Sequence, residues 1–120
     1  MNVFRDTLRG IAERVADTRA VAIVGVDGIP IETYSVGEAV SIESVAAELM
    51  ALLKSAQNPR AELSFGAIRE IALVGADQRA VLSRVSAEYY LLLLLGGEGT
   101  LGHGRFELAR AATGLQKELA

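Results

Sequence analysis

The sequence predicts an α+β domain in which helices pack on both faces of an antiparallel sheet. Helical and strand-like segments alternate in the order helix, two strands, helix, three strands, helix. Two of the strand-like runs, residues 21–26 and 89–95, are apolar on both faces, as strands are when both faces of a sheet are covered. The chain has 120 residues, of which 51% are hydrophobic and 22% charged, so we expect residues 1–120 to form one globular domain.

The first pair of strands is predicted by the dipeptide Asp27-Gly28, which lies between two β-rich runs. Asp-Gly favours a two-residue type I′ hairpin loop, because both central residues of that turn have positive φ. Such a loop would make Val26 face Ile29 across the hairpin. Pro30 follows in the second strand and has no N–H to donate, so we expect this strand to lie at an edge of the sheet.

Apolar residues at helical spacing predict three helices, at residues 2–16, 42–57 and 104–119. In the first helix, charged residues occupy the side opposite to the apolar stripe. Ser41 is a typical N-cap for the second helix, which we expect to end before Pro59.

Between the second and third helices, antiparallel strands joined by short turns are predicted at residues 68–75, 80–87 and 89–95. The first of these contains Arg69 and Glu70, whereas the last is uniformly apolar. We therefore expect residues 68–75 to form the edge of the sheet opposite to the strand that contains proline.

The second helix is apolar over most of its circumference. One stripe, which includes Leu49 and Leu53, is expected to face the sheet, while Ala47, Met50 and Ala51 cover a second face. A helix of this kind usually has a second surface to bury against, and in a domain this small we expect that surface to belong to a partner molecule. Only three residues of this helix are charged: Glu43, Glu48 and Lys54.

The sequence contains no arrangement typical of a catalytic or metal site. It has no cysteine, and His103 is the only histidine, so no thiolate site and no cluster of several histidines is available. No Gly-x-Ser-x-Gly motif is present, and the pattern singles out no two of the fifteen acidic residues as a catalytic pair. We expect no catalytic residue, no metal and no cofactor, with carboxylate chemistry left as an open alternative.

Residues 97–102 match the pattern Gly-x-Gly-x-x-Gly between a strand and a helix. In dinucleotide-binding folds this pattern places a pyrophosphate at a helix N-terminus, and a further parallel strand follows the helix. Here the helix is the last predicted element, and Glu98 within the loop would repel a phosphate. We interpret the segment as a flexible connection between strand and helix, with nucleotide binding as the less favoured alternative.

Charge and hydropathy argue against two further classes of function. Twelve basic and fifteen acidic residues give a net charge of −3, which argues against binding to nucleic acid. The N-terminal residues have no signal-peptide core, and polar side chains interrupt the longest apolar run, residues 81–95, so we expect no membrane insertion. The resulting expectation is a cytoplasmic protein.

The element order αββαβββα, together with four short segments, resembles the Roadblock (dynein light chain type) domain. The resemblance is to the bacterial branch that contains the gliding-motility GTPase regulators MglB and MglC, and it covers essentially the whole chain. The order and spacing of the segments, rather than any one of them, make the resemblance specific. The segments are residues 24–31 in the hairpin, 45–49 in the second helix, 86–90 before the last strand and 99–108 before the last helix.

The resemblance implies a five-stranded antiparallel sheet in the order 2-1-5-4-3, in a sandwich of the profilin and longin kind. The second helix would cover one face of the sheet, and the first and third helices the other. The resemblance also implies a homodimer, in which the third strands of two copies pair and the second helices pack side by side. The dimer edge would then consist of Ile68, Arg69, Glu70, Ile71, Ala72 and Leu73.

Functionally, the resemblance implies a non-enzymatic platform that binds a Ras-like small GTPase of the MglA type, or another Roadblock protein. MglB-like members stimulate GTP hydrolysis without donating an arginine finger. Two alternatives stay open: a small-molecule-sensing domain, which would need a cavity between sheet and helices, and an adaptor that binds other Roadblock proteins only. As the partner surface we assign the exposed part of the second helix, namely Glu43, Ala47, Met50, Ala51 and Lys54.

Overall fold

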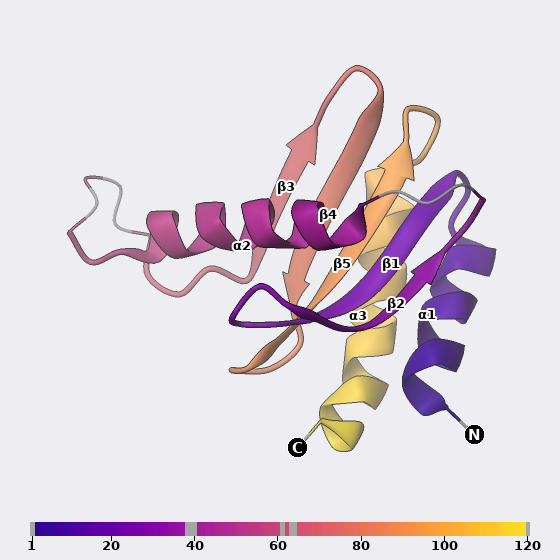
Figure 1. The fold of residues 1–120 in the computed structure, drawn as a ribbon, viewed down its shortest axis with the longest axis horizontal. Coiled ribbons are helices and arrows are strands. Elements are labelled where there is room, and N and C mark those ends of the chain that lie inside the picture. Colours follow the sequence, from indigo (N-terminus) through magenta and orange to yellow (C-terminus); the bar gives the residue numbers. More distant parts are fainter. Residues whose placement is uncertain (1, 38–40, 61, 63–64, 120) are drawn as a thin grey trace.

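The computed structural model describes residues 2–37, 41–60, 62 and 65–119. Within them the chain forms one helix, a hairpin, a second helix, three strands and a final helix (Figure 1). The helices are α1 (Val3–Arg14), α2 (Ile42–Gln57) and α3 (Leu101–Glu118). The strands are β1 (Thr18–Gly25), β2 (Pro30–Ser35), β3 (Glu70–Val74), β4 (Gln78–Arg84) and β5 (Tyr89–Gly96).

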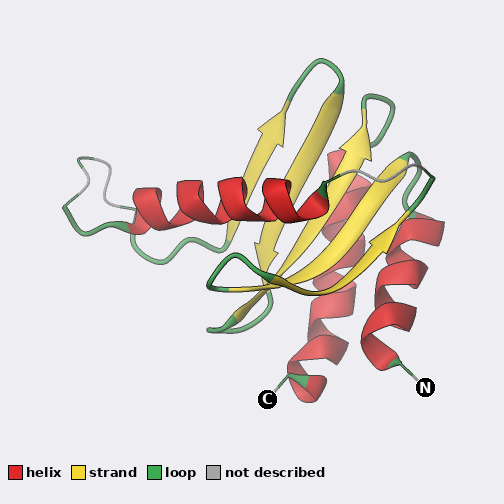
Figure 2. Ribbon diagram, viewed as in Figure 1, coloured by secondary structure: helices red, strands yellow, loops and turns green. Residues whose placement is uncertain are grey.

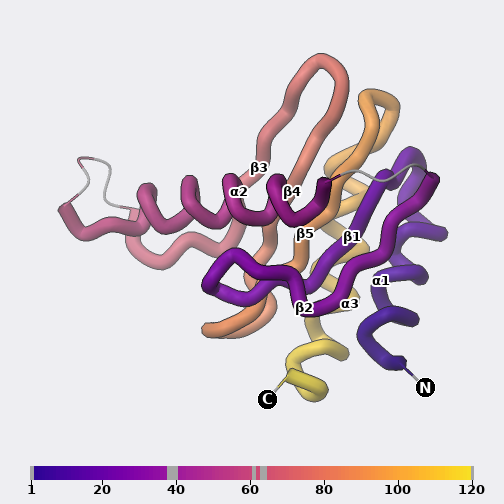
Figure 3. The backbone as a smooth tube through the Cα atoms, viewed as in Figure 1, coloured from indigo at the N-terminus to yellow at the C-terminus, as the bar shows by residue number. Residues whose placement is uncertain are grey.

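The strands form one antiparallel sheet in the order β2-β1-β5-β4-β3, which confirms the strand order that the Roadblock resemblance implies. α2 lies on one face of the sheet, and α1 and α3 lie on the other (Figure 2). The backbone tube shows that α2 crosses the strands rather than running along them (Figure 3). On the opposite face, α1 packs on β1 and β2, and α3 packs on β4 and β5. The predicted α+β class and both predicted edges are therefore confirmed.

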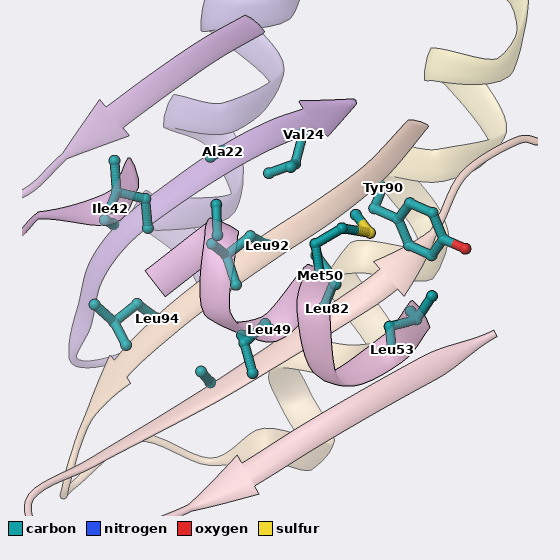
Figure 4. Close-up of a cluster of buried hydrophobic side chains, with 13 residues drawn as sticks. Ala22, Val24, Ile42, Leu49, Met50, Leu53, Leu82, Tyr90, Leu92 and Leu94 are labelled. Carbon is teal, nitrogen blue, oxygen red and sulfur yellow. The ribbon is translucent and has the colours of Figure 1, made fainter. Parts of the chain in front are cut away.

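Alternate side chains of the central strands β1 and β5 enter two separate cores. On the α2 side, Leu92 and Leu94 of β5 pack with Leu49 and Leu53 of the helix (Figure 4). The whole run Leu91–Leu95 is at most 1% exposed, which confirms that this strand is central and covered on both sides. The second core joins the intervening strand residues to α1 and α3, through Val21, Ile23, Leu91, Leu93, Leu8, Ile11, Leu108 and Leu115.

The loop of the β1–β2 hairpin is longer than the sequence predicts. The N–H of Gly25 donates to the carbonyl of Ile29 at 3.0 Å, and the N–H of Gly28 donates to the carbonyl of Gly25 at 2.9 Å, so residues 26–28 form the loop. Gly28 has a φ of +85°, but Asp27 does not have the positive φ that a type I′ turn requires there. The predicted two-residue loop is therefore wrong.

Two hydrogen bonds favour the longer loop. The carboxylate Oδ1 of Asp27 accepts the N–H of Ile29 at 3.0 Å, and the N–H of Val26 donates to the carbonyl of Glu88 at 3.0 Å. The backbone of Val26 is therefore hydrogen-bonded to the neighbouring β4–β5 turn. It does not pair with Ile29, as the predicted two-residue loop would require. Pro30 pairs with Val24 next to a bulge, and its missing N–H is tolerated because β2 is an edge strand.

The boundaries of the other elements lie within three residues of the predicted ones, and β3 and β4 are both shorter than predicted. α2 has the predicted bounds, whereas α3 begins at Leu101 rather than at residue 104 and includes His103 in its first turn. β4 begins at Gln78 because the β3–β4 turn is tight, with the N–H of Gly75 donating to the carbonyl of Gln78 at 2.9 Å.

Two glycines allow α3 to approach β5 closely. A Cβ added at Gly99 would lie 2.7 Å from Cβ of Leu95, and one added at Gly104 would lie 2.7 Å from Cδ2 of Leu93. Both distances are too short for ordinary contact in a packed interior. The glycines near the start of α3 therefore serve helix–strand packing, and Gly102 lies inside the helix rather than in a phosphate-binding loop.

Substitution of Gly104 tests this close approach. Gly104→Ala is expected to lower the free energy of unfolding by about 1–3 kcal/mol, because the methyl group is forced against Leu93. Gly114→Ala is the matched control in the same helix, where nothing lies within 4 Å of an added Cβ. The control should gain about 0.5–1 kcal/mol from the higher helix propensity of alanine. Urea unfolding followed by circular dichroism measures both, and equal effects would contradict the packing role of Gly104.

Candidate interaction surface

The outer face of α2 carries four of the five residues predicted to contact a partner. Glu43, Ala47, Ala51 and Lys54 are exposed on the side of the helix that faces away from the sheet. Ala47 and Ala51 lie one helical turn apart. Ala47 is on the side of this face next to the β1–β2 loop, where a Cβ added at Gly28 would lie 3.7 Å from Cα of Ala47. The exposure of these four residues is as expected, and their role in binding stays a prediction.

The fifth residue, Met50, is not exposed as predicted. It is 2% exposed and belongs to the core between α2 and the sheet (Figure 4). A Cβ added at Gly28 would lie 3.6 Å from Cβ of Met50, so the β1–β2 loop packs directly against this side of α2. The buried arc of α2 is wider than the helical stripe predicts, because a loop as well as the sheet covers it. The assignment of Met50 to the exposed surface is therefore wrong.

On the side toward β3, α2 has an apolar surface that remains open. Leu52 of α2 is 46% exposed, and Leu73 of β3 is 49% exposed. Together with Val45 they line a groove of about 300 Å³ between α2 and the β3–β4 hairpin. Neighbouring exposed leucines beside a groove are typical of an interaction surface, whereas single exposed apolar residues are not. We call Val45, Leu52 and Leu73 the α2–β3 flank.

β3 forms an open edge next to the α2–β3 flank, since it pairs with β4 alone among the described strands. The hydrogen bond from the N–H of Gly75 to the carbonyl of Gln78 shows which residues of β3 direct their backbone groups toward β4 and which direct them away from the sheet. By that alternation the N–H and C=O groups of Glu70, Ala72 and Val74 point outward. Such a row of unpaired groups is a template for a further strand.

The six predicted edge residues divide between β3 and the segment before it. Glu70, Ile71, Ala72 and Leu73 lie in the strand, and Arg69 immediately precedes it. Ile68 is half-buried against the α2 core, and its N–H donates to Oε1 of Gln57 at 2.7 Å. Ile68 and Arg69 thus connect α2 to the edge strand rather than forming part of it.

The two edges of the sheet differ in the side chains that they present on the α2 side. There the register places Thr33 and Ser35 on β2, and Ile71 and Leu73 on β3. Pro30 and the adjacent bulge also interrupt the backbone pattern of β2, as is common at edges that do not pair further. Apolar side chains are exposed near β2 as well, namely Ile29, Ile31 and Val36. The β3 edge is nevertheless the better candidate for pairing, since it combines a regular backbone with an apolar face.

Among the residues that the structure describes, no group of three or more His, Cys, Asp or Glu side chains is placed to hold a metal ion. His103 is exposed in the first turn of α3. None of the described helices combines the length and the apolar character that crossing a bilayer requires.

Sequence reasoning missed two clusters of charged residues. Glu107 is 4% exposed and lies between Arg14 of α1 and Arg110, with N···O distances of 3.9 and 3.7 Å. The sequence shows that Glu107 and Arg110 are three residues apart on one helix. It does not show that Arg14 joins them, because Arg14 comes from α1. The second is the pair formed by Glu70 of β3 and Arg105 of α3, in which the Nε of Arg105 donates to both carboxylate oxygens of Glu70 at 2.9 and 3.0 Å.

Solved structures match the fold over almost the whole chain. A Roadblock/LC7 domain from Streptomyces avermitilis superposes with a TM-score of 0.82 at 18% identity, covering 96% of each chain. MglC from Myxococcus xanthus gives a TM-score of 0.67 at 27% identity, covering 96% of this chain and 98% of that chain. The gliding protein MglB from Thermus thermophilus gives 0.84 at 13% identity, covering 100% and 95%. The chain has the Roadblock fold.

The Roadblock resemblance seen in the sequence is thus confirmed by the structure, and the chain is similar to MglB and MglC. No protein-family model matches the sequence, and no curated protein matches it. Within the Roadblock fold, α2 and the edge strand β3 present the candidate interaction surface described above.

Substitution of Met50 tests its buried position. Met50→Ala is expected to lower the free energy of unfolding by about 2–5 kcal/mol, because it removes a buried side chain and leaves a cavity. Ala51→Ser, at the next position on the exposed face, should change that free energy by no more than about 0.5 kcal/mol. Chemical denaturation measures both variants. Similar stabilities for the two would place Met50 outside the core.

Proposed function

We propose that this chain is a homodimeric interaction platform that binds and regulates a Ras-like small GTPase of the MglA type, or the signalling complex that contains it. Two copies pair through β3 and pack through the α2–β3 flank, and the exposed part of α2 contacts the GTPase. The platform acts in the cytoplasm and contributes no catalytic residue and no cofactor. The observation that supports this proposal most directly is the open edge of β3 beside the exposed flank.

The open edge supports the dimer in two ways. Pairing of two β3 strands would join two sheets and give hydrogen-bond partners to the outward backbone groups of Glu70, Ala72 and Val74. It would also bring Leu52 and Leu73 of one copy toward those of the other. Covering a half-exposed leucine contributes about 1 kcal/mol, so four of them would add a substantial apolar contribution to the pairing of the strands.

The two roles that the proposal gives to α2 use different sides of the helix. The dimer contact uses Leu52, on the side toward β3. The GTPase contact is assigned to the outer face, with Met50 removed from the predicted set because it is buried. The residues assigned to the GTPase contact are Glu43, Ala47, Ala51 and Lys54.

The comparisons support self-association and a regulatory role, since the structural neighbours include MglB and MglC. One solved MglB is described with a tetrameric arrangement. The sensor alternative has less support, because the cores on both faces of β5 are densely packed and the grooves lie at the surface.

Ala72→Pro tests pairing through β3. Proline removes an outward N–H, so the variant should be monomeric at micromolar concentration while the hydrogen bonds between β3 and β4 remain. Thr33→Pro is the matched control on the opposite edge strand, β2. The N–H of Val36 donates to the carbonyl of Arg19 on β1, so by the alternation along β2 the N–H of Thr33 points outward. Light scattering should report a dimer for this control and for the unmodified chain. A monomeric unmodified chain, or dissociation by both prolines, would reject the β3 dimer.

Ala47→Arg tests the GTPase contact. A long charged side chain at this exposed position of α2 should weaken GTPase binding by about tenfold or more. Ile31→Arg, at an exposed position on β2, is the control and should bind normally. The measurement uses purified Ras-like GTPases from the same genome, with GTP turnover and binding recorded with and without each variant.

The same experiment separates the alternatives. Unchanged GTP turnover and no GTPase binding, together with capture of a second Roadblock protein, would favour the adaptor. Binding of an apolar fluorescent dye, or a metabolite that co-purifies with the chain, would favour the small-molecule sensor.

A further inference from the structure

A groove on the α2 side of the sheet lies between the C-terminal half of α2, the β1–β2 loop, the residues before β3 and the β4–β5 turn. It has a volume of about 330 Å³. The loop and the turn that border it are joined by the hydrogen bond from the N–H of Val26 to the carbonyl of Glu88 (Figure 1). We call it the end groove. Its apolar lining consists of the buried Met50 and Leu53 and the exposed Val26, Ala67 and Ala87.

The end groove is basic, although the protein is acidic overall. The chain has a net charge of −3, but the charged side chains among the described lining residues are Lys54 and Arg84. Among the salt bridges of the described residues, none involves either of them. Two positive charges therefore border the groove without an ion pair in this part of the chain.

The register of the sheet places Arg84 on the α2 side. Arg84 faces Tyr90 across the β4–β5 pair, and Tyr90 belongs to the core beneath α2. Side chains that face each other in this way have Cβ atoms about 5 Å apart. The Nε of Arg84 donates to the carbonyl of Ser86 at 3.1 Å, which leaves the terminal amino groups for other acceptors. A guanidinium held in this way loses less conformational entropy on binding than a mobile one does.

The hydroxyl group of Tyr90 is a further donor at the end groove. Tyr90 is 4% exposed, and its hydroxyl points away from Leu92 and Met50 (Figure 4). Within the described chain, no residue forms a hydrogen bond with this hydroxyl. It is not sealed in the core, since the only fully buried side-chain polar atom without a partner among those residues is Nε of Arg79. A buried tyrosine usually bonds through its hydroxyl, so here the partner must come from the groove.

The polar groups of the end groove are donors, which fits a carboxylate with a neighbouring carbonyl. The ammonium group of Lys54 and the guanidinium of Arg84 donate hydrogen bonds and accept none. The Oε1 of Gln57 accepts the N–H of Ile68 at 2.7 Å, so the Nε2 of Gln57 is the group left for a ligand. Hydrogen bonds from cations to a carboxylate are about twice as strong as those between neutral groups.

The size of the end groove fits a single residue that carries all of these groups. A volume of about 330 Å³ is near the lower limit for ligand sites, so an extended segment would lie mostly outside it. Lys54 directly follows Leu53 in α2, so positive charge adjoins apolar surface. The C-terminal residue of a protein has a carboxylate and a side chain on one Cα, next to the preceding carbonyl. An internal acidic residue has its charge at the end of its side chain, with no apolar group beside it.

We propose that the end groove binds the C-terminal residue of a partner protein whose last side chain is apolar. The carboxylate pairs with Lys54 and Arg84 and accepts the hydroxyl of Tyr90, while the side chain packs against the apolar lining. Gln57 donates to the carbonyl that precedes the last residue. Apart from Lys54, the groove shares no residue with the proposed GTPase contact or the β3 edge, so the inference does not rest on the proposed function.

Fluorescence anisotropy of a fluorescein-labelled peptide, Gly-Ser-Gly-Ser-Gly-Leu, tests the proposal on the unmodified chain. The peptide with a free C-terminal carboxylate should bind about tenfold more tightly than the same peptide with a C-terminal amide, because the amide removes the charge. Replacing the last leucine of the peptide by serine should also weaken binding by about tenfold, because the apolar side chain is lost.

Two small competitors distinguish a protein terminus from a free acid. N-acetylleucine has the carboxylate, the side chain and the preceding carbonyl, whereas 4-methylpentanoate has only the first two. N-acetylleucine should displace the labelled peptide at a concentration about fivefold lower than 4-methylpentanoate does, because Gln57 has a carbonyl to bind.

Two pairs of matched variants locate the site. Tyr90→Phe removes only the hydroxyl and should weaken peptide binding by about fivefold, whereas Tyr34→Phe, outside the groove, should leave it unchanged. Arg84→Gln should likewise weaken binding by about fivefold, and Arg19→Gln, at an exposed position of β1, by less than about twofold. Circular dichroism and light scattering check that the fold and mass of each variant are unchanged.

Absence of peptide binding, equal binding of the carboxylate and amide forms, or equal effects within either pair of variants would overturn the proposal. Equal potency of the two competitors would also overturn it, in favour of a site for free carboxylic acids. None of these results bears on β3 pairing or on the GTPase contact, which the Ala72 and Ala47 variants test separately.

Discussion

The burial of β5 on both of its faces is the constraint on which the rest of the structure depends. Five consecutive leucines at positions 91–95 leave no side of this strand for water, so each face of the sheet must be covered by helices. The same requirement places β1 and β4 beside β5 and leaves β2 and β3 as the two edges. Gly99 and Gly104 belong to this arrangement, because they bring α3 into close contact with the leucines of β5. The pattern that looks like a nucleotide-binding loop is therefore explained by packing.

Helices cover the two faces unequally, and this inequality creates the candidate surfaces. A strand of eight residues, such as β1 or β5, is roughly 26 Å long, whereas a helix that crosses the strands covers about 10 Å of that length with its side chains. Two helices share one face, but α2 alone covers the other. The part of that face at Leu73 of β3 therefore stays open, with Leu52 and Leu73 half-exposed. On β2 the corresponding positions are Thr33 and Ser35, whose hydroxyl groups can remain exposed to water. Apolar residues thus remain where the sheet still has an unpaired edge.

Much of the fold followed from local patterns, whereas the details of the surface depended on contacts between distant residues. The apolar run at 89–95 predicted β5, and the apolar spacing of residues 42–57 predicted α2, because the information lies within one segment. Ser41 occupies the predicted N-cap position, although its side chain makes no capping hydrogen bond. The loop after β1 depended on the carbonyl of Glu88, far along the chain, so the Asp-Gly signal alone gave the wrong loop length. The prediction that Met50 is exposed was wrong for a similar reason. The loop that packs against Met50 belongs to the β1–β2 hairpin, which is distant from α2 in the sequence. No sequence pattern could have paired Arg105 with Glu70, because a helix and an edge strand far apart in the sequence bring them together.

The open surfaces on the two faces of the sheet meet at β3. On the α2 side, the strand forms one wall of the α2–β3 flank. On the opposite side, α3 packs on β4 and β5, and a groove of about 680 Å³ lies between α3 and the start of β3. The salt bridge between Arg105 and Glu70 spans this gap, so charge replaces apolar packing where the helix no longer covers the sheet. β3 is thus the strand that the chain's own helices cover least, on either face. A second strand paired with β3 would border both surfaces, because each surface is open toward that edge.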